Sequence, residues 1–302
     1  MPVFKVLVPL DGSRVAEHSL VYLDALRNMG DLQVLLLSVV DQWTEAHSLT
    51  PTEAGQREDN LLSTYLREVS SDIEKHSGIK VETKVVHGNP ASGVLEAAHS
   101  LKPDLLIIST HGRSGPSRWR LGSVADKVIR GAESDTLVVG PKAIEQERWM
   151  EAILKSPFQS ILVPLDGSDL AEAALVKAQA FAAAYGSTIH LVRAVPIPAI
   201  ADGYPGEAAY IPSLMDQMVE GAQEYLKQVA SRLTGVKEVK TDVAIGTAPM
   251  VLEDYSRANN VDLVVMTTHG RGGILRTALG SVTDRLLAGG VAPVLVVRPR
   301  AG

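Results

Sequence analysis

The 302-residue sequence contains no cysteine, which removes several kinds of chemistry at once. A disulfide scaffold, a thiolate nucleophile, and zinc or iron–sulfur sites with cysteine ligands are all excluded. Aromatic residues make up only 4% of the chain, so the core must be aliphatic. No apolar run reaches the 18 residues that a membrane-spanning helix needs, and the longest runs have the length of strands.

A basic surface is also missing from this sequence. The 29 Lys and Arg residues are outnumbered by 35 Asp and Glu residues, which gives a formal net charge of −6. An acidic chain is a poor match for nucleic acid or for an anionic membrane, so neither is expected as a partner. The first residues, Met1 to Lys5, lead into an apolar strand pattern without signal-peptide architecture. These features predict a cytoplasmic location.

The chain carries a long internal repeat. The repeated segments, in order, are VPLDGS at residues 8–13 and 163–168, THGR at 110–113 and 268–271, and LGSV at 121–124 and 279–282. This period is far too long for a solenoid, so it indicates a duplicated domain. We expect domains at residues 1–141 and 158–302. Residues 142–157 are expected to form a helical connector that Trp149 anchors.

Each copy alternates apolar strand patterns with amphipathic helix patterns. Strands are expected at 5–10, 32–40, 80–86, 105–109 and 136–139, then at 161–165, 188–195, 239–245, 262–267 and 293–297. Helices are expected at 13–29, 61–73, 90–101 and 123–130, then at 169–185, 213–233, 248–258 and 281–287. A polar segment with Pro51 and Gly55 should be irregular, and the proline-rich segment 195–212 should be extended. This order predicts an α/β fold with two tandem open parallel sheets, each five-stranded and flanked by helices.

The repeated segments follow strands or begin helices, where parallel sheets bind ligands. Helix N-termini offer unpaired N–H groups that attract phosphate, and glycines let the backbone approach an anion closely. Any one of these segments, such as Asp11-Gly12-Ser13, is more often a plain structural turn. Their recurrence in the same order favours a binding site, although duplication preserves turns as well.

The glycine pattern resembles that of the universal stress protein family, in a tandem form that covers nearly the whole chain. Nucleotide-binding members carry G-x-x-G, nine residues, and then G-[S/T]. The matching residues are Gly112, Gly122 and Ser123 in the first copy, and Gly270, Gly280 and Ser281 in the second. The first glycine of the pattern would fall at Ser109 and Thr267, so both copies depart there and place a Cβ where the family has none.

The resemblance implies a Rossmann-like domain, of the adenine nucleotide alpha hydrolase-like kind, that binds ATP, with magnesium as an accompanying ion. In the family, the aspartate after strand one contacts ribose or metal, backbone at the end of strand two holds adenine, and the glycine loop with its Ser or Thr holds phosphates. The implied ligand-binding residues are Asp11, Val40, Gly112, Gly115, Gly122 and Ser123, and then Asp166, Val195, Gly270, Gly273, Gly280 and Ser281. Domains of the family pair through their last strands, which implies an internal pseudo-dimer and leaves a further homodimer open.

Charged residues of the glycine loop allow two interpretations. Arg113, Arg118 and Arg120 either face phosphates or belong to a solvated loop, and the second copy retains only Arg271 and Arg276 there. The two sites are therefore expected to differ in affinity. The loop histidines at positions 111 and 269 fit a structural hydrogen-bonding role better than a catalytic or metal-binding one.

The sequence favours binding over catalysis. It has no G-x-x-x-x-G-K-[S/T] loop, no G-x-S-x-G elbow and no H-E-x-x-H helix. No catalytic residues are assigned. We expect a stress-response regulator or nucleotide sensor that binds ATP or a related adenine nucleotide and acts on an unknown protein partner. The alternatives are a slow ATPase on the same fold and a nucleotide-free stress scaffold.

Overall fold

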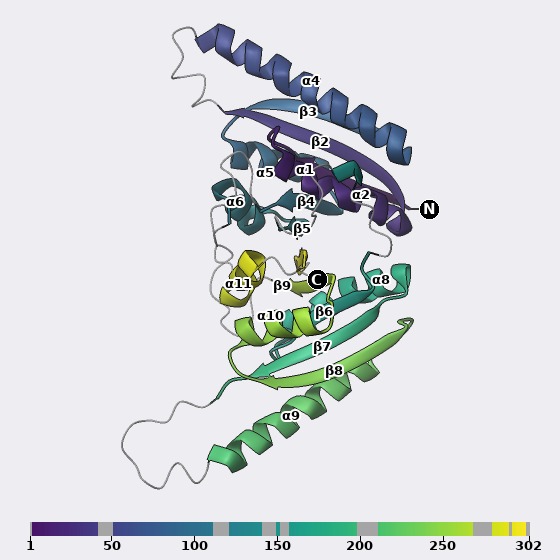
Figure 1. Cartoon of the computed structure of the whole chain (residues 1–302), viewed down its shortest axis with the longest axis vertical. Coiled ribbons are helices and arrows are strands. Elements are labelled where there is room, and N and C mark those ends of the chain that lie inside the picture. The colour runs from purple at the N-terminus through teal and green to yellow at the C-terminus, as the bar shows by residue number, and fades with distance from the viewer. Residues whose placement is uncertain are drawn as a thin grey trace, which may run out of the picture.

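A computed structural model describes residues 2–41, 51–110, 121–140, 149–151, 157–197, 211–267, 280–289 and 292–299 (Figure 1). The first repeat has strands β1 (Val3–Pro9), β2 (Asp31–Asp41), β3 (Val81–Gly88), β4 (Leu105–Ser109) and β5 (Asp135–Val139). The second has β6 (Ser160–Pro164), β7 (Thr188–Val195), β8 (Glu238–Ile245), β9 (Leu263–Thr267) and β10 (Val294–Val297). All of them join one sheet in the order β3-β2-β1-β4-β5-β10-β9-β6-β7-β8. Within each repeat the pairing is parallel, as predicted.

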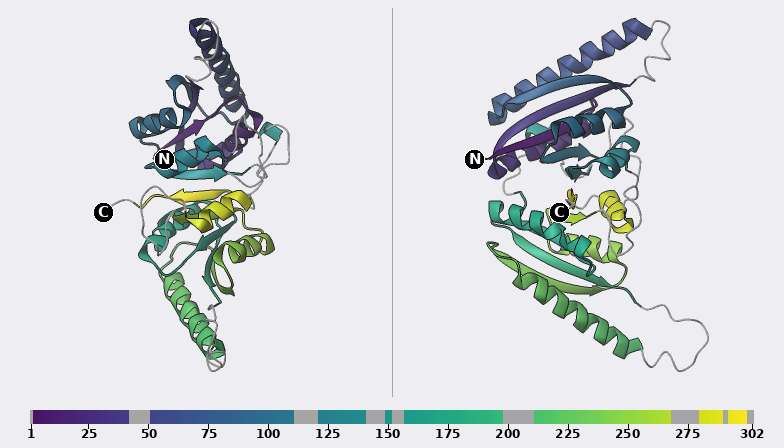
Figure 2. Two further views of the ribbon diagram at one scale, coloured as in Figure 1. Left: turned by 90° about the vertical axis from the view of Figure 1, so that its left-hand side faces the viewer. Right: turned by 180° about the vertical axis from the view of Figure 1, so that it is seen from behind.

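Helices cover both faces of this sheet (Figures 1 and 2). The first repeat has α1 (Arg14–Glu17), η1 (His18–Leu20), α2 (Val21–Ala25), η2 (Leu26–Met29), α4 (Pro51–Ser77), α5 (Pro90–Leu101) and α6 (Ser123–Gly131), and η3 (Trp149–Glu151) follows it. The second has α7 (Asp169–Glu172), α8 (Ala174–Tyr185), α9 (Ile211–Ser231), α10 (Ala248–Ala258) and α11 (Ser281–Gly289). In the part of the chain that the structure describes, no helix is long and apolar enough to cross a bilayer.

The core is divided into two layers by the sheet. One layer packs α1, α2, α4, α7, α8 and α9 against one face, and the other packs α5, α6, α10 and α11 against the opposite face. Every residue of β4, β5 and β9 is buried. A strand covered on both faces has no polar side, which is why these segments are mostly apolar and do not alternate.

The helix expected at residues 13–29 is instead a chain of short helices, α1, η1, α2 and η2. Its interruption coincides with a buried side-chain hydrogen bond: the Ser19 hydroxyl donates to the Ala16 carbonyl oxygen over 2.6 Å. Back-bonding of this kind to the preceding turn disturbs regular α geometry. The hydrophobic stripe predicted a helical segment correctly, but the spacing of its apolar residues gives no sign of where the helix is interrupted.

The expectation of an irregular segment at Pro51 and Gly55 is wrong, because α4 begins at Pro51 and runs through Gly55. Proline suits the first turn of a helix, where its missing N–H has no acceptor. Glycine inside a helix costs only about 1 kcal/mol. The buried stripe that includes Leu62, Leu66 and Ile73 holds the remainder of α4 on the sheet, so that small cost is outweighed.

Two further expectations fall largely outside the described residues. Of the proline-rich segment 195–212, residues 198–210 are not described, and α9 already includes Pro212. Of the connector 142–157, only the η3 turn and Pro157 are described. Trp149 in η3 is buried, and its ring forms a T-shaped pair with the His76 ring, with centroids 6.3 Å apart. This contact places the start of η3 against the end of α4.

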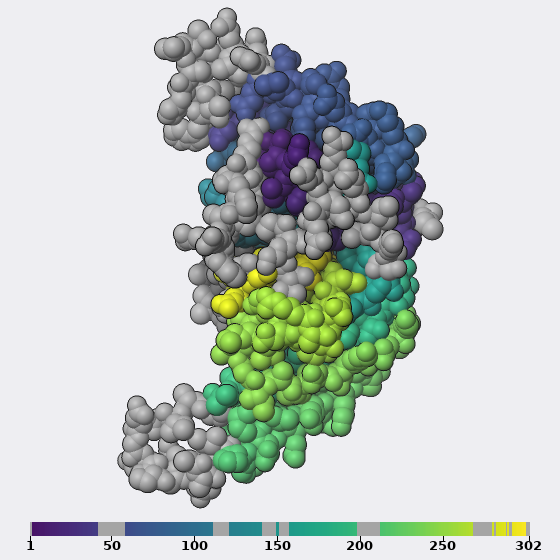
Figure 3. Space-filling view, viewed as in Figure 1, coloured from purple at the N-terminus to yellow at the C-terminus, as the bar shows by residue number. Residues whose placement is uncertain are grey.

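The two repeats are joined at the centre of the sheet. β5 and β10, the last strand of each repeat, pair antiparallel, with Leu137 opposite Leu295. This is the pairing that the resemblance implies within one chain. The space-filling view shows the first repeat, from purple to blue, stacked on the green second repeat (Figure 3).

Two aspartates at equivalent places in the two repeats, Asp104 and Asp262, lie at the amino ends of the strands. Asp104 accepts the Lys5 N–H over 2.9 Å, and Asp262 accepts the N–H groups of Gln159 (2.7 Å) and Ser160 (3.1 Å). Burial raises the pKa of Asp262 to about 6, an effect that these backbone N–H groups partly oppose. Both carboxylates accept backbone N–H groups near the start of the first strand of their repeat, at the edge of the sheet opposite the carboxyl ends of the strands.

Candidate functional site

A cavity of about 400 Å³ lies in the first repeat where three neighbouring strands end. Its walls include Asp11 after β1, Val39 and Asp41 of β2, and Ser109 of β4. β1 lies between β2 and β4, so the strand order reverses at this point, and ligand crevices form at such positions in open parallel sheets. The volume lies in the range of about 300–1,000 Å³ that small-molecule pockets have.

The turn after β1 holds the carboxylate of Asp11 at the wall of this cavity. Asp11 Oδ1 accepts the Ser13 N–H over 2.9 Å, and Ser13 Oγ in turn accepts the Ala16 N–H over 3.2 Å, which caps α1. Gly12 between them has φ +83°, a left-handed conformation that glycine adopts without strain. Asp-Gly-Ser therefore forms a structural turn, as one of the two interpretations expected. The same turn also places the Asp11 side chain at the wall of the pocket.

The second repeat builds the same turn. Asp166 Oδ1 accepts the Ser168 N–H over 2.9 Å, Ser168 Oγ accepts the Ala171 N–H over 3.2 Å, and Gly167 has φ +88°. The Ser168 hydroxyl adds a bond of 2.6 Å to Asp166 Oδ1. The predicted residues Asp11 and Asp166 thus occupy equivalent places, one after each first strand.

The opposite wall of the cavity is the start of α6. Its N-cap is Gly122, which has no side chain and provides no side-chain cap. The first intrahelical bond runs from the Asp126 N–H to the Gly122 carbonyl oxygen over 2.9 Å, so the amides of residues 123–125 lack helical acceptors. Ser123, Val124 and Ala125 line the cavity. These amides and the positive end of the helix dipole suit an anion.

The amide of Gly122 itself has another role. It donates to the Thr110 carbonyl oxygen over 2.8 Å and so ties the helix start to the end of β4. Gly122 and Ser123 both line the pocket, but the amides without helical acceptors that face it begin at Ser123 rather than at Gly122. Gly280 starts α11 in the same way, since its carbonyl oxygen accepts the Asp284 N–H over 2.9 Å just before Ser281.

At the end of β2, where the resemblance assigns the backbone of Val40, the neighbouring residues supply the side chains that line the cavity. The side chain of Val40 is fully buried, whereas its neighbours Val39 and Asp41 line the cavity, because side chains alternate along a strand. Val195, the counterpart in β7, is also buried and pairs with Ile245. The structure thus places Asp41 in the pocket, a residue the sequence analysis passed over.

Four predicted glycines lie outside the described residues: Gly112, Gly115, Gly270 and Gly273. The loop histidines and arginines belong to the same segments, 111–120 and 268–279. The departures from the glycine pattern are described: Ser109 and Thr267 are buried at the ends of β4 and β9, and Ser109 lines the cavity. A small hydroxyl residue at this position is therefore compatible with an open pocket in the first repeat.

A repeated Tyr–Glu pair behind the first turn was also missed. Tyr225 O–H donates to Glu172 Oε1 over 2.9 Å, and Glu17 interacts with the Tyr65 hydroxyl in the first repeat. Burial raises the pKa of Glu17, while the Tyr65 hydroxyl and Arg14 oppose that rise. Both pairs connect a long outer helix, α4 or α9, to the short helix after the Asp-Gly-Ser turn. The detectable signal was the recurrence of the same two residue types at equivalent positions.

Among the residues that the structure describes, no group of three or more His, Asp or Glu side chains is arranged to hold a metal ion. A magnesium ion at Asp11 would therefore need ligands from the bound molecule itself, and phosphate oxygens supply such ligands. This donor set fits an ion that enters together with a nucleotide.

The fold and cavity define a tandem α/β protein with a cavity at the carboxyl edge of the parallel strands of its first repeat. The sequence profile described as "Universal stress protein family" matches residues 3–140 and again residues 157–298. The chain therefore belongs to the universal stress protein family and contains two of its domains, as the resemblance predicted.

Several known proteins are similar to this chain. The universal stress protein Rv2005c of Mycobacterium tuberculosis is 26% identical over 225 residues, which cover 73% of this chain and 70% of that protein. The crystal structure of a universal stress protein from Archaeoglobus fulgidus matches 98% of this chain and 96% of that chain, with TM-score 0.70 and 20% identity, and so shares the fold. A universal stress protein in complex with cAMP matches 48% of this chain and 100% of that chain, with TM-score 0.38 and 22% identity.

Proposed function

We propose that this universal stress protein binds ATP or a related adenine nucleotide, together with magnesium, and acts as a stress-response regulator or nucleotide sensor. The observation that carries the proposal is the cavity that spans the ends of β2, β1 and β4 and meets the uncapped start of α6. We assign the two binding units to residues 1–141 and 158–302.

The order of the strands suits a ligand with three chemically different parts. Neighbouring strands lie about 4.8 Å apart, so the ends of β2 and β4 are separated by about 10 Å, with β1 between them. Apolar Val39 and Val94 line the β2 side, Asp11 lies at β1, and the α6 amides lie beyond β4. A base, a sugar and a phosphate, in that order, match an apolar wall, a hydroxyl acceptor and an anion site.

The sugar and phosphate assignments follow from the same contacts. Carboxylate oxygens only accept hydrogen bonds, so Asp11 pairs with ribose hydroxyls or with a magnesium ion on the phosphates. The amides of residues 123–125 and the Ser123 hydroxyl pair with phosphate oxygens. By equivalence, Asp166, Gly280 and Ser281 form a second site, to which Gly270 and Gly273 are assigned from the family pattern.

Calorimetric titration of the purified full-length chain with ATP and magnesium tests this proposal. We expect saturable binding heat from the wild type. In Gly122→Val, the first site should lose about tenfold or more in affinity, because a branched side chain then enters the pocket between Asp11 and α6. The Gly122 backbone, at φ −61° and ψ 147°, suits any residue, so this variant should fold.

The matched variant Gly280→Val reports on the second repeat. Heat that vanishes only when both glycines are replaced indicates two sites, and heat that vanishes with Gly122→Val alone indicates one. An absence of heat from wild-type protein with intact circular dichroism would overturn the proposal in favour of a nucleotide-free scaffold.

Slow ATP hydrolysis is the second candidate, and its test is separate. Phosphate release that disappears in the double variant Asp11→Ala plus Asp166→Ala would establish it. The described pocket contains no His, Lys or Cys, so its two carboxylates are the groups there that could act as a general base toward water.

A further inference from the structure

Asp41 is the one ionisable side chain on the β2 side of the described pocket. It closes β2, is partly buried, and lines the same cavity as Asp11. The neighbouring wall residues Val39, Pro90 and Val94 are all apolar. Asp41 therefore presents a negative charge at the end of the cavity farthest, in strand order, from the anion-binding start of α6.

We propose that Asp41 selects the base of the nucleotide by accepting a hydrogen bond from its amino group. This inference rests on the proposed nucleotide function. A carboxylate is an acceptor only, so a base edge that faces it must offer a donor. Adenine presents the 6-amino group, whereas hypoxanthine presents a 6-oxo group whose lone pairs would oppose the carboxylate.

The electrostatics of the pocket also fix the orientation of the ligand. A phosphate near Asp41 would bring like charges together beside apolar walls, where their repulsion is weakly screened. The start of α6 attracts the phosphate to the opposite side. Asp41 therefore disfavours the reversed pose and leaves its own end of the pocket to the base.

The second repeat has no acidic side chain at the equivalent position. Val40 and Val195 are equivalent strand-end positions, and the residue after Val195 is Pro196 where Asp41 follows Val40. Proline has neither a carboxylate nor an N–H group. Selection by an acidic side chain at this position is thus a property of the first repeat alone.

Asp41→Asn tests the proposal, because asparagine keeps the shape of aspartate but can donate as well as accept. Binding of ATP and of ITP, each with magnesium, is measured in the full-length chain in the Gly280→Val background, which isolates the first repeat. With Asp41 present, we expect ITP to bind about tenfold or more weakly than ATP, because its 6-oxo group puts an acceptor beside the carboxylate where adenine offers a donor. In Asp41→Asn, the two affinities should come within about threefold of each other, since the amide can pair with either base.

The outcomes separate this inference from the function on which it rests. If ATP binds and the ratio of ATP to ITP affinity is the same before and after the Asp41→Asn substitution, base selection by Asp41 is overturned while nucleotide binding stands. If neither nucleotide binds the folded wild-type chain, the proposed function itself fails. A purely structural role for Asp41 would weaken ATP and ITP alike and leave their ratio unchanged, which also counts against the proposal.

Discussion

At the scale of single residues, the second repeat contains a hydrogen-bonded chain around a buried histidine, and the equivalent positions of the first repeat do not. His190 Nδ1 lies 2.9 Å from the Tyr255 hydroxyl, and His190 Nε2 lies 3.2 Å from Ser160 Oγ. A neutral imidazole, with one donor and one acceptor nitrogen, satisfies both partners. Burial lowers the pKa of His190, Lys240 lowers it further, and Glu238 opposes them. The equivalent positions in the first repeat are Lys5, Leu35 and Ala97.

This histidine predicts a pH dependence of stability with a definite sign. Its pKa in the folded protein lies below the value of about 6.5 in an unfolded chain, so the unfolded state binds more protons. The contribution of neutral His190 is complete above about pH 6.5 and is lost as the pH falls below that value. His190→Leu, which copies Leu35, should flatten the change in unfolding free energy between about pH 7 and pH 5, as measured by urea denaturation.

The variant should also be less stable at neutral pH, by about 1–3 kcal/mol, because it leaves the Tyr255 hydroxyl without its partner. Gln228→Leu on the exposed side of α9 is the control and should keep the wild-type pH profile. An unchanged profile in His190→Leu would contradict the assignment of a neutral buried imidazole.

At the scale of elements, the packing of α5 on the sheet depends on one glycine. A Cβ at Gly93 would lie 3.1 Å from Val39 Cγ2 and 3.3 Å from Val86 Cγ2, closer than normal contacts. Val39 and Val86 are opposite each other in β2 and β3. In the second repeat, Val251 stands at the helix position while Ala194 and Ala244 face each other on β7 and β8. The first repeat thus has a small residue on the helix and two valines on the sheet, whereas the second has a valine on the helix and two alanines on the sheet.

Exchanging the large and small side chains at these three positions should give a variant in which the substitutions compensate one another. Gly93→Val alone should destabilise the protein by about 1–3 kcal/mol, since it overpacks the contact between α5 and the sheet. Adding Val39→Ala and Val86→Ala reproduces the arrangement of the second repeat and should recover most of that loss. Urea midpoints of the single and triple variants measure the recovery, and a triple variant less stable than the single one would refute the compensation.

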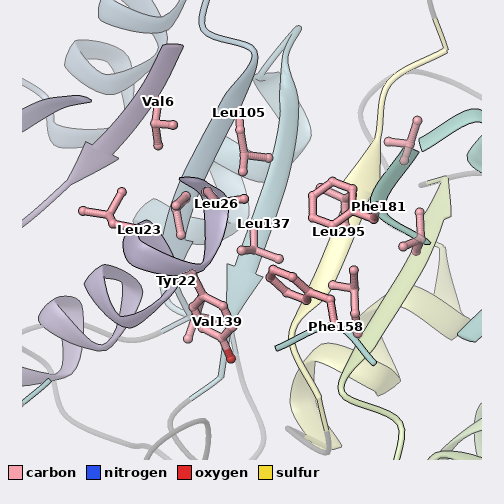
Figure 4. Packing of buried hydrophobic residues seen from close by; sticks show 14 of the residues in the cluster. Val6, Tyr22, Leu23, Leu26, Leu105, Leu137, Val139, Phe158, Phe181 and Leu295 are labelled. Carbon is pink, nitrogen blue, oxygen red and sulfur yellow. The ribbon is translucent and has the colours of Figure 1, made fainter. Parts of the chain in front are cut away.

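At the scale of the whole molecule, the two repeats meet through an asymmetric joint. The Phe158 ring lies among those of Tyr22, Phe181 and Tyr185, with centroids 5.9, 5.3 and 5.1 Å away. Figure 4 shows Tyr22, Phe158 and Phe181 beside Leu137 and Leu295, the central pair of β5 and β10. The Tyr185 hydroxyl also donates to the Ala25 carbonyl oxygen over 2.6 Å. A chain with few aromatic residues thus concentrates four of them between its halves.

A second polar contact crosses the same joint. Lys177 of α8 pairs with Asp135 of β5 over 2.8 Å, and Asp135 also accepts the Arg298 N–H over 2.8 Å. The side chain of Asp135 is 8% exposed, so these partners compensate a nearly buried charge. Together with the strand pairing, these contacts predict that the repeats unfold as one cooperative unit.

Truncation of the central ring tests that cooperativity. Phe158→Ala should lower the free energy of unfolding by about 3–5 kcal/mol and should separate the unfolding of the two repeats, because it opens a cavity at their joint. Urea denaturation followed by circular dichroism and by limited proteolysis detects both effects. Tyr185→Phe is the matched control: it removes one hydrogen bond, should cost about 1 kcal/mol, and should keep a single transition. A single, unshifted transition in Phe158→Ala would contradict this account of the joint.

The sequence alone determined the features that depend on local order. Apolar runs and amphipathic stripes located nearly every strand and helix, because burial on one or both faces imposes a spacing that is visible in the chain. The internal repeat established the duplication, and Asp11, Gly122 and Ser123 were identified by their positions after strands and before a helix. Local signals failed at Pro51, where a residue that often breaks helices begins one instead.

Only the tertiary structure decided what depends on neighbours distant in sequence. The strand order brings Asp41 to the wall of a pocket with Asp11, and the pleat of β2 turns Val39 toward that pocket and Val40 away from it. The bond from the Gly122 amide to Thr110 removes one expected anion donor. Residues that meet in this way are far apart in the sequence, and no regular spacing in the chain marks them as neighbours. Their contacts form only when the strands pack in one order and one register, which the hydrophobic pattern alone does not specify.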